Sequence, residues 1–347
     1  MRLLLITQKV DRNDHYLSFF HRWIIEFSKH FESIVVICLE EGEHGLPSNV
    51  RVLSLGKEER QSRLQYLIHF YWYIFHERKN YDAVLSHMNQ EYINLGGVIW
   101  RLMGKRVSMW RNHHAGSFLT RTAGWLAHKV FCTSKYSYTA TFPNIVFMPL
   151  GIDTSLHTPD AVEKRIPHSI LFFARINKVK RPHILIDAVG QLRDQGVKST
   201  VAIFGDALPK DAEYAEGLRE KVKSMNLSDS ISFHPGMPND KTPEVFRDYQ
   251  IFVNLSPSGM YDKMIFEAAS CHALALSSNE NLRGQIDERL VFKEGSLDDL
   301  VSKLRILLTS APEEVQALQK EFREYVIQKH SLQFLGKRIE EEIHAIK

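Results

Sequence analysis

Four cations are grouped in the segment FFARINKVKRPHILIDAV. Arg175, Lys178, Lys180 and Arg181 lie within seven residues, after an apolar run and just before Pro182, a residue favoured in the first turn of a helix. Cations beside the positive end of a helix dipole bind phosphate oxygens. A solvated basic loop is the alternative for any one of these side chains. Their grouping nevertheless favours an anion site.

A lone carboxylate, Glu267, stands in the stretch SPSGMYDKMIFEAASC. Most of its neighbours are apolar or small, and a loop of Ser, Pro and Gly precedes it. Glu267 is therefore either a helix-capping acid or the partner of a ligand that offers hydroxyl groups.

Polar residues in the first half also follow apolar runs. They are a pair of histidines and three short side chains: His113, His114, Asp11, Asn13 and Asp14. A histidine alone is usually a surface or packing residue, so the pair in WRNHHAGSF is a weak signal. The three residues in DRNDHY could bind a substrate, or they could cap a helix that starts near His15.

A metal site is not expected. No set of His, Asp or Glu has the spacing of metal ligands, and no Asp-x-Asp follows a strand-like run. The three cysteines, Cys38, Cys132 and Cys271, lie far apart in apolar runs, which favours buried thiols in a reducing cytosol. We therefore expect that no metal ion is required and that cations of the 175–181 loop supply the charge that a divalent ion gives elsewhere.

Short β-rich runs alternate with helical periods along the chain. Seven runs occur in the first half: 2–7, 33–39, 50–55, 83–87, 106–110, 129–134 and 144–150. Five more follow: 169–175, 200–205, 230–235, 251–256 and 273–278. Apolar strands that alternate with helices belong to parallel sheets covered on both faces.

This alternation predicts an α/β protein with two tandem, Rossmann-like, doubly wound parallel-sheet domains. A turn-rich hinge, 149–169, separates them. We expect residues 1–150 to form the first domain and 151–330 the second, with a helix in 331–347 that could cross back to the first. Ligands of such sheets lie beyond the carboxyl ends of the strands, which places the site in a cleft faced by both domains.

Several classes of protein are excluded. The loop after the first strand has no glycine, so it lacks the G-x-G-x-x-G of a dinucleotide site, and no Walker motif occurs. The pair Gly96-Gly97 falls in an expected helix and indicates close packing. With 347 residues and a net charge of +3, the chain can fill two cores and gives no global case for nucleic acid.

Membrane contact is a separate question. No apolar run reaches the roughly 18 residues of a membrane span, and the N-terminus resembles a strand more than a signal peptide. The helix expected over RLQYLIHFYWYIFHERK, 63–79, is apolar almost all round, and most such helices are buried. The alternative is a surface that touches lipid or a lipid-linked acceptor, with cations at the headgroups. The segment VIWRLMGKR, 98–106, also combines apolar and aromatic residues with basic ones.

Together these motifs resemble the GT-B retaining glycosyltransferases of family 4. RINKVKR is similar to the family's R-L-x-x-x-K-G loop, and the segment through Glu267 is similar to its E-G-F-G-L-V-x-L-E-A-M-A-C-G. VFCTSKYSYTATF and PLGIDTS fall where the family has its last N-domain strand and its hinge. The likeness covers nearly the whole chain.

The resemblance implies an enzyme that moves a sugar from a UDP- or GDP-sugar donor to an acceptor hydroxyl with retention of configuration. By the match, Arg175 and Lys180 hold the diphosphate, Glu267 binds the ribose hydroxyls, and His114, or else His113, lies beside the reactive face of the sugar. Further donor contacts are implied at four positions: Gly259, Asp262, Met264 and Ile265. Asp11, Asn13 and Asp14 replace the family's glycine-rich acceptor loop.

The chain departs from the family pattern at three positions. Gly259 stands where the family's first Glu contacts the donor sugar, Arg181 replaces the Gly after the Lys, and His272 replaces the Gly after Cys271. Asp262 could reach a sugar hydroxyl in place of the missing Glu, or it could be a turn-forming surface residue. These changes bear on the identity of the donor sugar more than on the fold.

The implied partners are the nucleotide-sugar donor and a glycan or lipid-linked acceptor, without nucleic acid and without a bound cofactor. The implied setting is the cytoplasm, in polysaccharide or glycolipid assembly, with peripheral contact at the inner face of the membrane as an option. Two alternatives stay open. One is a different GT-B enzyme, such as an inverting transferase or a nucleotide-sugar epimerase. The other is a non-catalytic nucleotide-sugar binding protein, which Gly259 makes possible.

Overall fold

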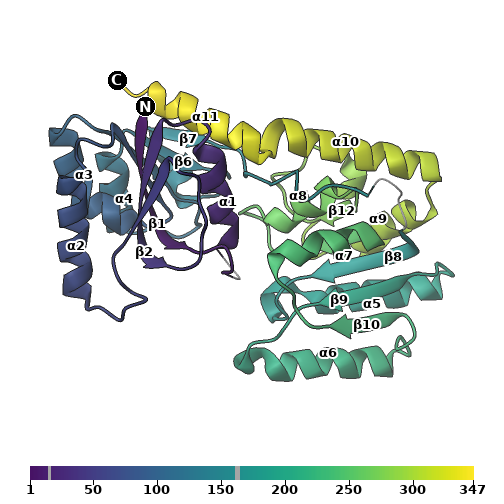
Figure 1. Cartoon of the computed structure of the whole chain (residues 1–347). Coiled ribbons are helices and arrows are strands. Elements are labelled where there is room, and N and C mark those ends of the chain that lie inside the picture. The colour runs from purple at the N-terminus through teal and green to yellow at the C-terminus, as the bar shows by residue number, and fades with distance from the viewer. Residues whose placement is uncertain (15–16, 161–164) are drawn as a thin grey trace. The chain divides into compact units, whose positions relative to one another are not determined.

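The computed structural model describes residues 1–14, 17–160 and 165–347. The helix start expected near His15 and part of the expected hinge lie outside these residues. The chain divides into two compact units: unit 1 is Met1–Gly151 with Leu332–Lys347, and unit 2 is Ile152–Ser331. Each is built on one parallel sheet covered by helices (Figure 1). The predicted α/β class with two doubly wound parallel sheets is confirmed.

Unit 1 contains a seven-stranded sheet with the order β3-β2-β1-β4-β5-β6-β7. Its strands are β1 (Arg2–Val10), β2 (Ser33–Glu41), β3 (Val50–Ser54), β4 (Ala83–His87), β5 (Arg106–Trp110), β6 (Lys129–Cys132) and β7 (Ile145–Phe147). Its helices are α1 (Ser18–Phe27), α2 (Arg63–His76), α3 (Gln90–Leu102), α4 (Phe118–Leu126) and α11 (Leu332–His344). The chain order reverses between β1 and β4, which makes their carboxyl ends the switch point of this sheet.

Alternate residues of β1 bury themselves in two different layers. Leu3 and Leu5 belong to a core with residues of α1 and α11, whereas Leu4 and Ile6 belong to a core with residues of α2, α3 and α4. Both faces of the strand are covered. This is why its sequence is continuously apolar and does not alternate with polar residues.

Unit 2 contains a five-stranded sheet with the order β10-β9-β8-β11-β12. Its strands are β8 (Ile166–Phe173), β9 (Thr200–Phe204), β10 (Ile231–His234), β11 (Tyr249–Asn254) and β12 (Leu274–Ser277). Its helices are α5 (Pro182–Asp194), α6 (Ala212–Ser224), α7 (Thr242–Asp248), α8 (Lys263–Ser270), α9 (Leu297–Thr309) and α10 (Pro312–His330). Here the chain order reverses between β8 and β11, so the loops that follow these two strands begin side by side.

Several local predictions have outcomes in the structure. The three cysteines are free and buried, as expected. Gly96 and Gly97 lie in α3, where an added Cβ would meet Trp100 and Leu126 respectively, so close packing is confirmed.

The interpretation of residues 63–79 as a fully buried helix is wrong, because only Phe70 and Ile74 of α2 are buried. Among the described residues, no helix combines the length and the apolar composition that crossing a bilayer requires.

Candidate functional site

The switch point of unit 2 brings two of the motifs together. The Nζ of Lys180, in the loop after β8, lies 2.8 Å from Ser256 Oγ and 2.8 Å from Asp262 Oδ2, both in the loop after β11. The cationic loop and the segment through Glu267 are far apart in the sequence and meet here because β8 and β11 are neighbours. In doubly wound sheets this is where ligands bind.

The loop after β8 is shaped by a close approach of two backbones. Gly205, which directly follows β9, has φ +147°, and a Cβ there would lie 1.9 Å from the carbonyl oxygen of Ala174. The amide of Ile176 then donates to the carbonyl of Asp206 (3.0 Å), which extends the pairing beyond the strands. Asn177 Oδ1 accepts from the amide of Lys180 (3.0 Å) and closes a short 3-10 turn. This turn directs Lys180 toward the β11 side.

Lys180 and Arg181 in this loop have carboxylate partners within the unit. Lys180 pairs with Asp262, and Arg181 pairs with Glu294 through a contact of 3.0 Å. Arg175 and Lys178 are exposed. Arg181 also has a left-handed backbone, with φ +54°, immediately before α5 begins at Pro182. Glu294 was missed by sequence reasoning, because it lies far along the chain and no spacing links it to Arg181.

Asp262 is the N-cap of α8, and both of its carboxylate oxygens are engaged. Oδ1 accepts from the amide of Met264 (3.2 Å), and Oδ2 accepts from Asn254 Nδ2 (3.0 Å) and Ser256 Oγ (3.3 Å) as well as from Lys180. Burial alone would raise the pKa of Asp262, but Lys180 and the neighbouring donors lower it overall. Asp262 is therefore an ionised side chain that holds Lys180 in place.

Glu267 lies in the middle of α8 and is only 6% exposed. It is the fifth residue of the helix, so the alternative that Glu267 caps the helix is wrong, and Asp262 is the N-cap instead. Lys263 precedes Glu267 by four residues, the spacing at which helical side chains are neighbours. Burial lowers the pKa of Lys263 to about 7, and Glu267 opposes this change. Sequence reasoning missed Lys263, although the four-residue spacing was a usable signal.

The other residues expected to contact the donor are placed around the same helix start. Met264 is half-buried and Ile265 is buried. Gly259 has φ +133°, a conformation that L side chains rarely adopt, and its carbonyl accepts from Asn281 Nδ2 (2.6 Å). A glutamate could occupy this position only with backbone strain. The absence of the family's first Glu thus coincides with a backbone that favours glycine.

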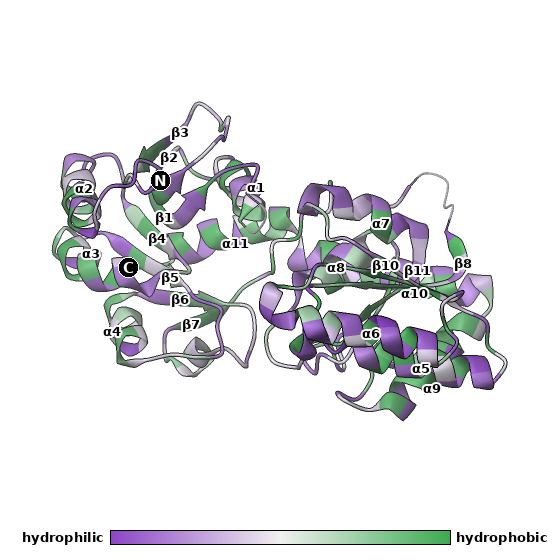
Figure 2. Cartoon of the chain, turned by 90° about the horizontal axis from the view of Figure 1, so that it is seen from below, coloured by the Kyte–Doolittle hydropathy of each residue, from purple (hydrophilic) through white to green (hydrophobic). Residues whose placement is uncertain are grey.

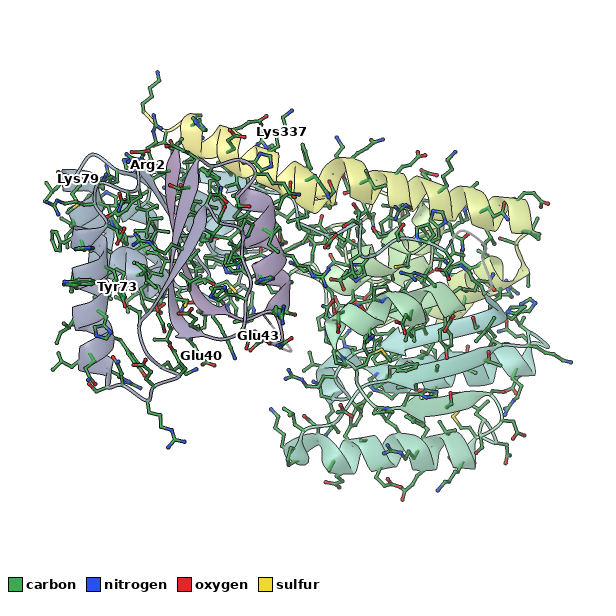
Figure 3. All side chains as sticks on the ribbon, viewed as in Figure 1. Arg2, Glu40, Glu43, Tyr73, Lys79 and Lys337 are labelled. Carbon is green, nitrogen blue, oxygen red and sulfur yellow. The ribbon has the colours of Figure 1, made fainter. Side chains whose placement is uncertain are left out.

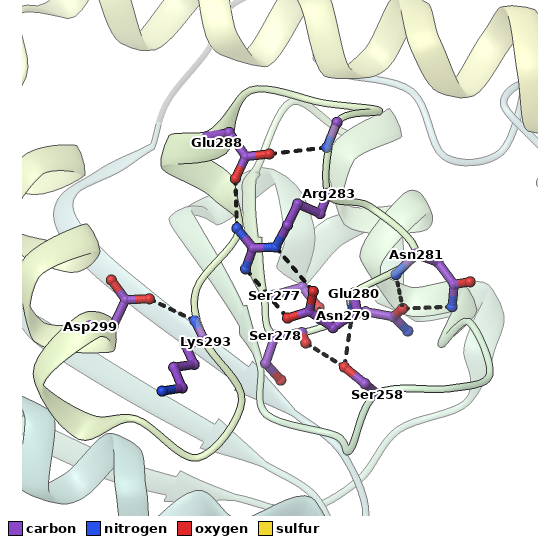
Figure 4. Close-up of polar contacts among 11 residues, drawn as sticks. Ser258, Ser277, Ser278, Asn279, Glu280, Asn281, Arg283, Glu288, Lys293 and Asp299 are labelled. Carbon is purple, nitrogen blue, oxygen red and sulfur yellow. Dashed lines mark hydrogen bonds and ion pairs between the residues drawn. The ribbon is translucent and has the colours of Figure 1, made fainter. Parts of the chain in front are cut away.

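The loop after β12 holds the loop after β11. Ser258 Oγ donates to the carbonyl of Ser278 (2.7 Å) and accepts from the amide of Glu280 (3.1 Å), as Figure 4 shows. The amide of Ser258 donates to Glu294 Oε2 (2.8 Å), the same carboxylate that pairs with Arg181. Burial alone would raise the pKa of Glu294, but the Ser258 amide and Arg181 lower it overall. The Glu294 carboxylate therefore joins the loop after β8, through Arg181, to the loop after β11, through Ser258.

The histidine pair of unit 1 follows β5 and is exposed. The two rings stack with their centroids 4.5 Å apart. His113 Nδ1 accepts from the amide of Ala115 (3.0 Å), and the carbonyl of His113 accepts from the amide of Tyr138 (2.9 Å). These bonds fix the backbone of the pair.

The three short polar residues of unit 1 follow β1 in a charged cluster. Lys9 Nζ lies 3.3 Å from Asp11 and 3.0 Å from Asp14. Asp14 Oδ1 also accepts from the amide of Leu17 (2.8 Å), just before α1, and Asn13 Nδ2 donates to Glu43 Oε2 (2.9 Å). The structure brings these residues together at the carboxyl end of β1.

His87 also lies at the switch point of unit 1, although the sequence indicated it only as the end of a strand. It ends β4, is 3% exposed, and its ring stacks on Phe20 with centroids 3.8 Å apart. Its Nδ1 lies 3.4 Å from Thr7 Oγ1. A histidine that ends a strand next to the chain reversal was the signal that could have found it.

Within residues 1–14, 17–160 and 165–347, no three His, Cys, Asp or Glu side chains are grouped so that they could hold a metal ion.

Comparison with known families accounts for unit 2. Residues 160–329 match the family described as glycosyl transferases group 1. The matched residues make up nearly all of unit 2. The Lys180–Asp262 pair and Glu267 therefore lie within the segment that matches this family, at the switch point of the unit 2 sheet.

Curated relatives match part of the chain. A D-inositol 3-phosphate glycosyltransferase from Arthrobacter sp. (strain FB24) is 26% identical over 144 residues, which are 39% of this chain and 34% of the relative. A phosphatidylinositol N-acetylglucosaminyltransferase subunit from Arabidopsis thaliana is 27% identical over 206 residues, 57% of this chain and 43% of the relative. The matched segments thus span less than half the length of either relative.

Solved structures match over both units. HepE from Anabaena, crystallised in complex with UDP, superposes with a TM-score of 0.77 at 16% identity, covering 99% of this chain and 100% of that one. A glycosyltransferase from Rickettsia africae gives a TM-score of 0.75 at 14% identity, with 99% of both chains covered. Units 1 and 2 together have the GT-B fold.

Proposed function

We propose that the protein is a glycosyltransferase that moves a sugar from a UDP- or GDP-sugar to an acceptor hydroxyl with retention of anomeric configuration. The observation that carries this proposal is Lys180, held by Asp262 and Ser256 at the switch point of unit 2, within the segment that matches the group 1 glycosyl transferases. The names of the curated relatives support glycosyl transfer. HepE, which shares the fold, has also been crystallised with UDP-glucose, which supports a nucleotide-sugar donor.

Different residues would bind the diphosphate and the ribose diol of the donor. Lys180 and Arg175 would contact the diphosphate, since both lie in the loop beyond the carboxyl end of β8. Glu267 would accept hydrogen bonds from the two ribose hydroxyls. Gly259, Met264 and Ile265 would complete the donor contacts. Asp262, whose oxygens are already engaged, would act as a positioning residue for Lys180.

The transfer would replace one bond at the anomeric carbon. The bond from this carbon to the diphosphate oxygen breaks, and its electron pair leaves with the diphosphate. A bond to the acceptor oxygen forms on the same face, and the acceptor proton passes to a phosphate oxygen. Arg175 and Lys180 would stabilise the charge that grows on the diphosphate, and His114 would lie beside the reactive face of the sugar.

The acceptor would be a glycan or a lipid-linked molecule that contacts unit 1. Asp11, Asn13, Asp14 and His113 are the candidate residues, since they follow β1 and β5. The three free, buried thiols suit a reducing compartment, so we place the reaction in the cytoplasm.

A second candidate function is nucleotide-sugar binding without catalysis. Gly259 favours it, because the backbone there disfavours the side chain that the family uses toward the donor sugar. An inverting transferase or an epimerase on the same fold is distinguished by its product.

A panel of UDP-, GDP- and ADP-sugars in a thermal-shift assay tests the proposal first, since a ligand of the folded state raises the melting temperature. Product analysis by NMR with an acceptor library follows. We expect a stabilising donor and a product with the donor's anomeric configuration. The inverted anomer would indicate an inverting transferase. A converted sugar nucleotide formed without any acceptor would indicate an epimerase. Binding without turnover across the library would favour the non-catalytic function.

A further inference from the structure

A band of apolar side chains is exposed on the helices that cover one face of the unit 1 sheet. It contains Leu64, Ile68 and Trp72 of α2, Val98 and Leu102 of α3, and Trp125 of α4, which are 53–85% exposed. We call these six residues the apolar band. Large apolar side chains gathered on a surface mark a site of contact with a protein or a membrane.

The band follows from the way these helices pack. Phe70, Ile74 and Trp100 bury the inner sides of α2 and α3 in the core of the sheet. On α2, the band residues recur every four positions, so they share one side of the helix. This side is free because the sheet buries only the other.

The three helices form one layer. Tyr71 OH donates to the carbonyl of Leu95 (3.2 Å) and joins α2 to α3. Thr122 Oγ1 donates to Asn94 Oδ1 (2.7 Å) and joins α3 to α4. Figure 2 shows α2, α3 and α4 next to one another along one side of unit 1. The exposed side chains therefore belong to one continuous surface.

The same part of the chain is strongly basic. Residues 60–147 contain eleven of the chain's 44 Lys and Arg but three of its 41 acids, a local excess of eight against +3 for the whole chain. Two of these acids, Glu77 and Asp82, pair with Arg51 and Arg2. No acid occurs between Glu91 and Asp153, where seven Lys and Arg occur. Lys79 follows α2 at its C-terminal end, as Figure 3 shows.

We infer that the apolar band docks on the surface of an anionic lipid bilayer. Apolar side chains on a helical surface enter the boundary between headgroups and acyl chains, while nearby cations attract anionic lipids. A second copy of this chain fits the surface poorly, because docking band to band would oppose two basic surfaces. The cores of protein interfaces are also poor in charge. This inference does not depend on the proposed transfer reaction.

Co-sedimentation of the whole protein with vesicles tests the apolar contact. We expect binding to vesicles of phosphatidylcholine with phosphatidylglycerol, and at least tenfold weaker binding for the Ile68→Ser/Trp72→Ser variant. The matched control is Ile306→Ser/Ile327→Ser, which changes two exposed isoleucines of unit 2 and should bind like the wild type. Circular dichroism confirms that both variants fold. Equal binding by both variants would overturn the inference.

A second pair of variants tests the charge. Arg63→Ala/Lys79→Ala removes two exposed cations at the ends of α2, and Lys223→Ala/Lys320→Ala removes two exposed cations of unit 2. Each basic residue near an anionic surface contributes about 1 kcal/mol, so the first variant should bind roughly thirtyfold more weakly. Added salt should weaken binding of the wild type. Equal affinity for vesicles with and without phosphatidylglycerol would contradict the inference.

Tryptophan fluorescence gives an independent reading. Trp72 and Trp125 are exposed, whereas Trp23, Trp100 and Trp110 are buried. Vesicles should shift the emission to shorter wavelength, and Trp72→Phe/Trp125→Phe should abolish the shift. If analytical ultracentrifugation instead shows a dimer that Ile68→Ser/Trp72→Ser dissociates, and vesicles cause no shift, the band covers a second copy and the membrane inference fails.

Discussion

At the scale of single residues, the pair between Lys180 and Asp262 decides how the candidate site presents positive charge. Lys180 is half-buried, and its amine is fixed between Asp262 and Ser256 before any ligand arrives. A charge that is already oriented and partly shielded from water stabilises a developing negative charge more effectively than a mobile one. Lys180 is therefore suited to the chemical step as well as to binding.

Loss of the cations should lower turnover more than donor affinity. Lys180→Ala or Arg175→Ala should lower kcat by about a hundredfold to a thousandfold, because their help grows as the diphosphate leaves. Steady-state kinetics beside donor Kd values measures this split. Lys198→Ala, an exposed cation at the opposite end of the sheet just before β9, is the control. A loss that appears equally in Kd and in kcat/KM, with kcat unchanged, would mean that both cations only bind.

Lys263 should make stability depend on pH in a defined direction. Its pKa is about 7 in the folded protein, below its ordinary value of 10.5, so between these values the unfolded chain binds more protons and stability rises with pH. Below pH 7 the amine is charged in both states and the cost of burying it is constant. In Lys263→Met this pH dependence is absent.

Urea unfolding of the wild type and Lys263→Met between pH 6 and pH 10 measures the effect. The wild type should gain free energy of unfolding relative to the variant as the pH rises above about 7. Other titrating groups are common to both proteins and cancel in the difference. A difference that stays constant across this range would show that the Lys263 pKa is not lowered.

At the scale of elements, the backbone explains why the family has glycine at two positions where this chain has Arg181 and His272. Arg181 has φ +54° before α5, and His272 has φ +63° immediately after Cys271, the C-cap of α8; both conformations are left-handed. Glycine adopts this conformation without a steric cost, and it is common just past the end of a helix. The family's glycines at these two places are therefore explained by geometry. Arg181 offsets some of the cost through its pair with Glu294.

The elements themselves were predictable from the sequence, whereas contacts between distant elements were not. Every expected β-rich run overlaps a strand, because buried parallel strands are continuously apolar. The meeting of Lys180 and Asp262 depends on β8 and β11 being neighbours, which no local pattern encodes. For a similar reason, the sequence left the exposed side of α2 as an alternative to burial. Its periodicity cannot show that only one side would be covered.

Two glycine-to-alanine substitutions in helices should change the free energy of unfolding in opposite directions. Gly96→Ala in α3 would place a Cβ 2.5 Å from the ring of Trp100, which is buried and donates to Tyr81 OH, so we expect destabilisation by about 1–3 kcal/mol. Gly217→Ala in α6 meets nothing within 4 Å and should stabilise by about 0.5–1 kcal/mol. Urea unfolding of both variants checks this. Stabilisation by Gly96→Ala would contradict the packing described for α3.

At the scale of the whole molecule, the charge is divided unevenly. The surplus of basic residues lies in residues 60–147 of unit 1, while in the candidate donor site of unit 2 Lys180 and Arg181 pair with carboxylates. The net charge of the whole chain, +3, is therefore smaller than the local basic excess in unit 1. In the candidate donor site of unit 2, carboxylates neutralise part of the positive charge. The two features would serve different ligands, a lipid surface and a nucleotide diphosphate.

Transfer should proceed without a divalent metal ion. Arg175 and Lys180 would supply the positive charge at the diphosphate, so activity should persist after dialysis against EDTA. An assay of donor turnover before and after chelation measures this, with a metal-dependent transferase treated alongside as a control. Activity that disappears with EDTA and returns with manganese would contradict the prediction.

The most direct test of the donor site is a calorimetric titration of nucleotide-sugars into the wild type and Glu267→Gln. Ribose contacts would be made equally in the ground and transition states, so the variant should bind the donor more weakly by about 1.5–3 kcal/mol, roughly tenfold to 150-fold in Kd, with kcat nearly unchanged. Glu321→Gln, an exposed acid on α10, is the control and should bind like the wild type. If no UDP- or GDP-sugar binds the wild type, or if Glu267→Gln binds as tightly as the wild type, unit 2 does not hold the donor as described.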